Sequence, residues 1–268
     1  MKKVSNIKRN WDYIVENFRI LAKVTVEYKF NFLSSIFVQL IYFAITIGIY
    51  LIITNNLGQV FGWTKWDFIL FIILQDTIWC FSGLFFWDKN LFDYIKKGDL
   101  NKFILRPINP FKGYFFSKLN TTALIMLVMN IPILILLFYY LEIPLIKIGV
   151  VIIMSLFIMI QYDILNSLYE SFNFHYLGSS QYIREINNSL ESVMRIYPTP
   201  FYSKFRYKYF LTIVTTFYVG SILIPYIMGY EIWNLKLQIL IYFTINIIAG
   251  LIVYYNWHYG LKKYEAFG

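Results

Sequence analysis

Polar side chains that could do chemistry occur at only a few places in an otherwise apolar chain. Asp76 is the single charge in the run 68–87, and a lone carboxylate within a membrane-spanning segment is costly and often functional. A second set of polar residues recurs at steps of four, three and four, which places its members on one face of a helix: Arg184, Asn188, Glu191 and Arg195. These side chains could line a pathway or join neighbouring helices, and Arg184 or Arg195 could pair with Asp76. For Asp76 we favour a bond between helices over a contact with substrate.

Residues of the types that form catalytic or metal sites are scarce. The chain has 2 histidines, His175 and His258, and 1 cysteine, Cys80, and none has a metal-type or triad-type partner nearby in the sequence. The sequence also lacks a Gly-x-x-x-x-Gly-Lys-Ser/Thr string, which would cradle the phosphates of ATP. We therefore expect this chain to be no enzyme and to bind no metal or cofactor itself.

The composition indicates a protein that is dissolved in lipid. Of the 268 residues, 59% are hydrophobic and 15% are charged, whereas a soluble domain carries about 25% charged residues. A net charge of +9 would suggest a nucleic-acid partner for a soluble protein. Lys and Arg also flank membrane spans on the cytoplasmic side, and this bias alone makes membrane proteins basic. We expect a multi-pass protein of the cell membrane that binds no nucleic acid.

One amphipathic stretch and several charge-poor runs predict an all-α integral membrane fold. Residues 4–27 carry apolar side chains at three- and four-residue steps opposite a charged stripe, as in a helix that lies in the membrane interface. A helix needs about 20 apolar residues to cross the hydrocarbon core. Runs of that kind occur at 30–54, 68–87, 119–141, 148–169 and 237–257.

Between the last two of these runs, two segments compete for one further crossing. The loop 88–118 carries seven Lys and Arg residues, so the positive-inside rule places it and the N-terminus in the cytoplasm. With six crossings in total, the C-terminal Lys262-Lys263 pair is also cytoplasmic. Segment 209–230 is uncharged, whereas 178–197 holds four charges that would cost about 10 kcal/mol at mid-membrane. Hydropathy therefore favours 209–230 as the fifth crossing.

The basic loop 88–118 contains a short motif with clear local physics. A first helix is expected to end at Gly98, which would adopt the left-handed cap conformation. Asp99 is expected to cap a second helix, which the Arg106-Pro107 pair ends. The apolar face of this second helix is expected to consist of Leu100, Phe103 and Ile104. A helix of under two turns that is apolar on one side and lies in a cytoplasmic loop is suited to contact a partner protein.

This motif resembles the coupling-helix region of type-2 ABC transporter permeases, where a basic residue, Gly, a capping residue and a Leu-rich turn precede Pro. In this chain the stretch reads Tyr94-Ile95-Lys96-Lys97-Gly98-Asp99-Leu100-Asn101-Lys102-Phe103-Ile104-Leu105-Arg106-Pro107-Ile108-Asn109-Pro110. The C-terminal string is also similar to that of the family, and it reads Tyr259-Gly260-Leu261-Lys262-Lys263-Tyr264-Glu265-Ala266. The order of elements agrees over nearly the whole chain.

The resemblance implies the transmembrane permease subunit of an ATP-driven exporter that works by alternating access. ATP and Mg²⁺ would bind to a separate ABC ATPase, present twice in the complex, and a second permease chain, identical or homologous, would complete it. The coupling helix of the family docks into a groove of the ATPase, which implies that role for Gly98, Asp99, Leu100, Phe103, Ile104, Leu105 and Arg106. In the family a Pro and a re-entrant hairpin follow the fifth crossing, so the Tyr197-Pro198 pair would make 178–197 that crossing.

The alternative is a channel or secondary transporter that works without an ATPase. It would use Asp76, Asp163 and the stripe of Arg184 and Glu191 as an ion path. Such folds often contain internal repeats with paired broken helices. The sequence has no convincing repeat, which favours the ATP-driven exporter.

Overall fold

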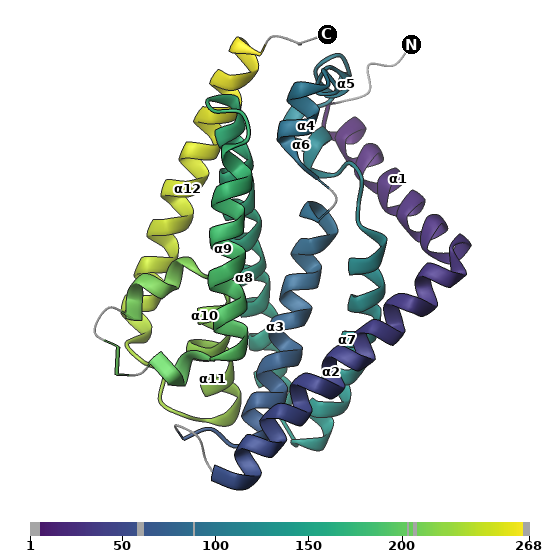
Figure 1. The fold of residues 1–268 in the computed structure, drawn as a ribbon. Coiled ribbons are helices and arrows are strands. Elements are labelled where there is room, and N and C mark those ends of the chain that lie inside the picture. Colours follow the sequence, from purple (N-terminus) through teal and green to yellow (C-terminus); the bar gives the residue numbers. More distant parts are fainter. Residues whose placement is uncertain (1–5, 58–61, 88, 203, 206–207, 265–268) are drawn as a thin grey trace.

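The computed structural model describes residues 6–57, 62–87, 89–202, 204–205 and 208–264 of the chain. Throughout this part the regular elements are helices and no strand forms, so the all-α prediction is confirmed. The long helices form a bundle (Figure 1). They are α1 (Asn6–Glu27), α2 (Lys29–Leu57), α3 (Lys65–Phe86), α7 (Thr121–Tyr140), α8 (Leu145–Ser171), α9 (Ser179–Ile196) and α12 (Leu235–Lys263).

Five helical stretches in the described residues are long and apolar enough to cross a membrane: Phe32–Asn55, Lys65–Lys96, Thr121–Tyr140, Leu145–Phe174 and Leu235–Lys263. Each overlaps one of the five charge-poor runs of the sequence. The start of α1 and the end of α12 lie at the same end of the bundle, next to the short helices that connect α3 with α7 (Figure 1).

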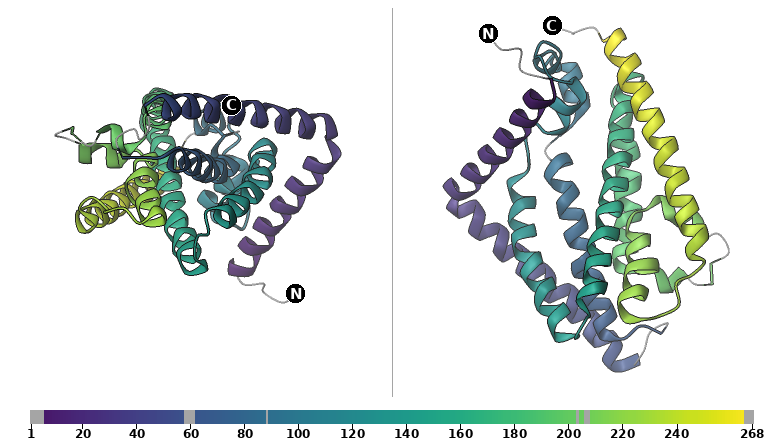
Figure 2. Two further views of the ribbon diagram at one scale, coloured as in Figure 1. Left: turned by 90° about the horizontal axis from the view of Figure 1, so that it is seen from below. Right: turned by 180° about the vertical axis from the view of Figure 1, so that it is seen from behind.

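Helix α3 lies at the centre of the bundle, which is visible in the view along the helices (Figure 2). Most of its residues are buried, and it packs against α2, α7 and α8. Phe68, Leu70 and Phe71 are fully enclosed in the largest apolar core. A buried polar side chain on α3 therefore needs hydrogen-bond partners within the protein, because leaving it unpaired there is costly.

The amphipathic stretch 4–27 corresponds to α1, which meets α2 at a bend near Tyr28 (Figure 1). In its second half Leu21 is buried with Ala123 and Leu127 of α7. In its first half Trp11 is largely exposed. The exposed indole suits the interfacial position expected for this helix, and that position stays a prediction.

The uncharged run 209–230 does not form the single long helix that hydropathy favours. It is divided into η3 (Lys208–Ile213), α10 (Thr216–Tyr218), the π-helical turn η4 (Val219–Leu223) and α11 (Ile224–Met228). Close packing and side-chain hydrogen bonds hold this segment. A Cβ atom on Gly220 would lie 2.3 Å from Thr199 Oγ1, and the Thr199 hydroxyl donates to the carbonyl of Phe217 at 3.1 Å. Hydropathy counts apolar residues and cannot register such contacts.

The remaining elements are short. Three of them form the loop between α3 and α7, one follows α8, and one follows α9. They are α4 (Leu91–Lys96), α5 (Asn101–Ile104), α6 (Pro110–Phe115), η1 (Phe172–Phe174) and η2 (Thr199–Tyr202).

Candidate functional site

The loop between α3 and α7 is an ordered unit in which side chains cap the short helices. Asn90 accepts a hydrogen bond from the backbone N–H of Phe92 at 3.1 Å and so caps α4. Asn109 caps α6 in the same way, through Lys112 N at 3.1 Å. Gly98 follows α4 with a φ of 71°, which is the left-handed conformation expected of it.

Asp99 does not cap α5, in contrast to the expectation from the sequence. Leu100 occupies the cap position with helical dihedral angles, and no side chain caps this helix. The N–H of Leu100 donates to the carbonyl of Tyr94 at 3.1 Å, so the chain turns from α4 into α5 without the extended residue that a side-chain cap requires.

The carboxylate of Asp99 pairs with Lys102 instead, at 2.6 Å. The hydrogen bond from Lys102 and the charges of Lys102, Lys118 and Lys97 lower the pKa of Asp99. The carboxylate is therefore ionised at neutral pH. Its negative charge therefore offsets part of the positive charge of Lys97, Lys102 and Lys118 on the surface beside α5.

The apolar residues around α5 point in opposite directions. Leu100 and Phe103 are 0% and 4% exposed, and the ring of Phe103 packs against that of Tyr94 with 5.6 Å between centroids. Ile104 and Leu105 are 38% and 83% exposed. The expected common face of Leu100, Phe103 and Ile104 is therefore wrong, because the packing of the loop buries the first two side chains and leaves the third exposed. The surface that this turn offers consists of Lys102, Ile104, Leu105 and Arg106.

An aromatic cluster joins the loop to the ends of α8 and α12. The ring of Trp257 on α12 lies 5.5 Å from Tyr114 and 5.2 Å from Phe111, both on α6. Phe174, just beyond α8, lies 5.1 Å from the same indole. These ring contacts join the loop to η1, which follows α8, and to α12. We call this set the bracing cluster; its buried members are Leu91, Tyr94, Ile95, Leu100, Phe103, Tyr114, Val253 and Trp257.

Gly260 permits the close approach on which the bracing cluster depends. A Cβ atom at this position would lie 2.3 Å from Cγ and 2.6 Å from Cβ of Phe174. We expect Gly260→Ala to lower the free energy of unfolding by about 1–3 kcal/mol, the usual cost of overpacking. The thermal unfolding midpoint of the purified protein measures this loss. Gly250→Ala on the same helix is the matched control, since no atom lies within 4 Å of its added Cβ; an equal loss there would contradict the packing argument.

Glu170, near the end of α8, was not among the residues singled out from the sequence, and it organises the start of the loop. Its carboxylate accepts a hydrogen bond from Leu91 N at 2.6 Å and a longer one from the Tyr114 hydroxyl at 3.4 Å. It also forms an ion pair with Arg184 of α9. Arg184 further donates to the carbonyl of Lys89 at 3.3 Å. Arg184 is therefore engaged at the loop end of the bundle and does not pair with Asp76.

Asp76 is the centre of a buried polar cluster between four helices. Its Oδ1 accepts a hydrogen bond from Arg195 of α9 at 2.8 Å. Its Oδ2 accepts hydrogen bonds from Gln39 of α2 at 2.6 Å and from Asn130 of α7 at 2.8 Å. Gln39 also donates to Asn130 at 3.3 Å. We call these four residues the Asp76 cluster; of the two candidate partners for Asp76, the structure selects Arg195.

Aromatic residues hold the same end of α9. The guanidinium of Arg195 lies 4.4 Å from the ring centre of Trp79 and 5.8 Å from that of Tyr42, which adds cation–π attraction to the ion pair. The hydroxyl of Tyr50 donates to the carbonyl of Ile196 at 2.5 Å and to that of Arg195 at 3.2 Å. Two of the terminal carbonyls of α9, which have no partner within the helix, are satisfied in this way.

Glu191 and Asn188 occupy different surroundings on α9. Glu191 is buried and accepts hydrogen bonds from Thr215 N at 3.2 Å and Oγ1 at 2.7 Å and from the Thr216 hydroxyl. Asn188 is exposed, and the neighbouring Asn187 is buried instead, where it accepts a hydrogen bond from Tyr169 at 3.2 Å. Of the four polar residues predicted on one face of α9, Arg184, Glu191 and Arg195 therefore bind other residues of the chain. Asn188 is exposed.

Comparison with known proteins assigns the chain to a family. The profile of the ABC-2 family transporter proteins matches residues 40–268, which includes the Asp76 cluster apart from Gln39, the loop between α3 and α7, and all later helices. No curated protein and no solved structure matches the chain. On the family match, this chain belongs to the ABC-2 family of membrane transporter proteins.

Proposed function

We propose that the chain is the transmembrane permease subunit of an ATP-driven exporter, coupled to a separate ABC ATPase that binds ATP and Mg²⁺. The observation that carries this proposal is the exposed pair Ile104 and Leu105 on a rigid loop. Exposed apolar side chains on such a short, basic turn are stabilised when a partner protein covers them and removes them from water. The bracing cluster would transmit a push on this turn to α8 and α12.

The proposed topology has six crossings with both termini in the cytoplasm, and α9 is the fifth. Helix α9 has 18 residues, a length of about 27 Å at 1.5 Å per residue, and it runs beside α8 (Figure 1). The apolar stretch Thr216–Met228 would measure only about 20 Å by the same rule. Residues 199–230 would then form a hairpin that returns to the outer end of the bundle before α12.

The polar side of α9 supports a pathway formed with a second permease chain. Polar side chains on a crossing helix cannot face hydrocarbon without a large cost. On α9 several of them are exposed in the single chain: Gln181, Glu185, Asn188, Ser189 and Ser192. A second copy or homologue would cover this face and enclose an aqueous pathway. ATP binding would draw two ATPases together, and the two permease chains would rock about this interface to give alternating access.

A channel or secondary transporter is the weaker candidate. Its ion path would need carboxylates that are free to exchange ligands. Asp76 and Glu191 are each held by several protein donors, and Asp163 accepts a hydrogen bond from Ser82 at 2.5 Å. These carboxylates are better suited to join helices than to relay ions.

The side of the membrane on which the loop lies tests the proposal directly. We expect Lys102→Cys to react with a membrane-impermeant maleimide only after cells are opened, because an ATPase must reach this turn from the cytoplasm. Glu142→Cys, in the connection between α7 and α8, should react in intact cells. Both positions are exposed, and the native Cys80 is buried and gives little background.

The result that refutes the exporter is equally clear. Labelling of Lys102→Cys in intact cells would place the turn outside, where no ATPase could contact it. An ATPase that carries a Walker motif and is encoded by the adjacent reading frame should co-purify with the chain. Its failure to do so would also contradict the proposal.

A further inference from the structure

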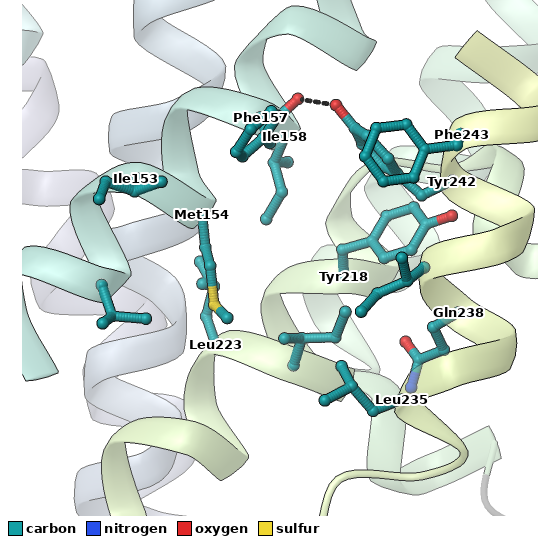
Figure 3. A pocket seen from close by; sticks show the side chains of 13 residues that line it. Ile153, Met154, Phe157, Ile158, Tyr218, Leu223, Leu235, Gln238, Tyr242 and Phe243 are labelled. Atoms are coloured by element: carbon teal, nitrogen blue, oxygen red, sulfur yellow. Dashed lines mark hydrogen bonds between the residues drawn. The ribbon is translucent and has the colours of Figure 1, made fainter. Parts of the chain in front are cut away.

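An apolar crevice lies between α8 and α12 and has a volume of about 430 Å³ (Figure 3). Small-molecule sites commonly have about 300–1,000 Å³. Ile153, Met154 and Phe157 line it from α8, and Ile239 and Phe243 line it from α12. Its floor is the π-helical turn η4, through Ile222 and Leu223, with Tyr218 just before it.

The few polar groups on the lining are already engaged or enclosed. Tyr242 donates to the carbonyl of Phe157 at 2.6 Å, across one end of the crevice (Figure 3). The side-chain oxygen of Gln238 accepts a hydrogen bond from Ser221 at 2.6 Å, and its nitrogen donates to the carbonyl of Trp233 at 2.5 Å. The hydroxyl of Tyr218 is buried. An occupant would therefore find mainly apolar walls, which suits a hydrocarbon chain.

The crevice has the length and position of part of one membrane leaflet. Its lining extends from Val150 to Ile158 on α8 and from Leu235 to Phe243 on α12, about 12 Å on each helix at 1.5 Å per residue. The hydrocarbon core of a bilayer is about 30 Å thick, or about 15 Å per leaflet. Both lining stretches start within a few residues of the helix ends that lie far from the loop with α5 (Figure 1).

The rim of the crevice is apolar, as a surface in contact with lipid must be. Its rim residues Ile153, Phe157 and Phe243 are exposed and apolar, and α9 contributes none of the lining. The polar face of α9 is the surface that needs cover by a second chain under the proposed function. The apolar rim of the crevice can contact lipid without such cover.

We propose that the crevice is a binding site for one acyl chain of a phospholipid from the leaflet remote from the α5 loop. This rests on the proposed function for the face that a second chain would cover and for the assignment of that leaflet to the outside. The bound chain would fill the space between α8 and α12 and hold η4 in place. The π-helical turn would thereby be stabilised, since an i→i+5 turn is a rare and less stable backbone form.

Native mass spectrometry of the purified full-length chain tests this site without ATP or an ATPase. As collision energy rises, we expect the wild type to retain one phospholipid per chain after the loosely bound lipids are lost. Met154→Trp would fill the crevice and should lower the retained fraction by at least about tenfold, the effect of 1.4 kcal/mol. Ile152→Trp is the matched control, because Ile152 is exposed on the same helix outside the lining, and it should retain the lipid.

A second pair of variants keeps the test independent of any folding defect in the first. Ile239→Trp lines the crevice from α12, and its neighbour Leu240→Trp does not. Loss of the tightly held lipid in Ile239→Trp but not in Leu240→Trp would support the site. Delipidated wild-type chain should also regain thermal stability with a long-chain phosphatidylglycerol and not with a six-carbon analogue.

Three outcomes would overturn the proposal. The first is the absence of a retained lipid in the wild type. The second is retention of the lipid at the wild-type level in both Met154→Trp and Ile239→Trp. The third is a disulfide-linked dimer of Ile153→Cys. The last would mean that a second copy of the chain covers the crevice. None of these outcomes bears on whether an ATPase binds the α5 loop, so the transporter proposal would be tested separately.

Discussion

Replacing Asp76 or Arg195 singly by leucine is expected to lower the free energy of unfolding by about 3–5 kcal/mol, and replacing both together is expected to cost far less. The side chains of the pair are 3% and 18% exposed. Removal of one partner leaves the other as an uncompensated charge in a low-dielectric interior. Removal of both leaves Gln39 and Asn130, which can still bond to each other at 3.3 Å.

The double-mutant cycle measures this coupling through unfolding of the purified chain in detergent. Val193→Leu, on the exposed side of α9, is the control and should leave stability unchanged. If the two single losses simply add in the double variant, Asp76 and Arg195 do not depend on each other. The charge-exchanged pair Asp76→Arg with Arg195→Asp should also recover part of the stability that Asp76→Arg loses, and a failure to do so would count against the ion pair.

Replacing Leu105 by aspartate is expected to remove the ATPase from the purified complex and to abolish ATP-driven transport, while the permease itself inserts and folds normally. Leu105 is 83% exposed, so its loss leaves the packing of the chain intact. A central apolar residue of a protein interface commonly contributes 2 kcal/mol or more to binding. A loss of about 2 kcal/mol weakens binding by about 30-fold, and the added carboxylate must also be desolvated in the contact.

The measurement is the amount of ATPase that co-purifies with a tagged permease at equal membrane expression. Ile104→Asp should act in the same direction. Leu177→Asp is the matched control, because Leu177 is a half-exposed apolar residue between η1 and α9, outside the α5 turn. Phe103→Asp should instead destabilise the fold, since Phe103 belongs to the bracing cluster. An unchanged ATPase yield with Leu105→Asp and Ile104→Asp would show that the motor does not dock on this turn.

Features that depend on neighbouring residues in the chain could be predicted from the sequence. The charge-poor runs matched the five helices that are long and apolar enough to cross a membrane, because hydropathy is summed over about 20 consecutive residues. The left-handed Gly98 after α4 followed from local backbone sterics. The family resemblance carried by the α5 turn and the C-terminal string was confirmed by the match over residues 40–268.

Some polar partners had a signal in the sequence that was overlooked. Gln39 and Asn130 are amides in the uncharged runs 30–54 and 119–141, and Glu170 directly follows the charge-poor run 148–169. Since an unpaired polar group within a membrane span is costly, each could have been marked as a member of a buried network. Their mutual arrangement could not have been inferred in that way.

The sequence by itself determined the five segments that are long and apolar enough to cross and the left-handed Gly98 that separates the first two short helices of the basic loop. Tertiary structure alone decided the choice of Arg195 for Asp76, 119 residues apart, the binding of Arg184 by Glu170, and the inward direction of Phe103 against the outward direction of Leu105. It also decided that residues 209–230 form several short helical segments that pack against η2 and α9. The physical reason is that propensity and hydropathy act between near neighbours in the chain, whereas ion pairs and close packing depend on which distant helices lie side by side.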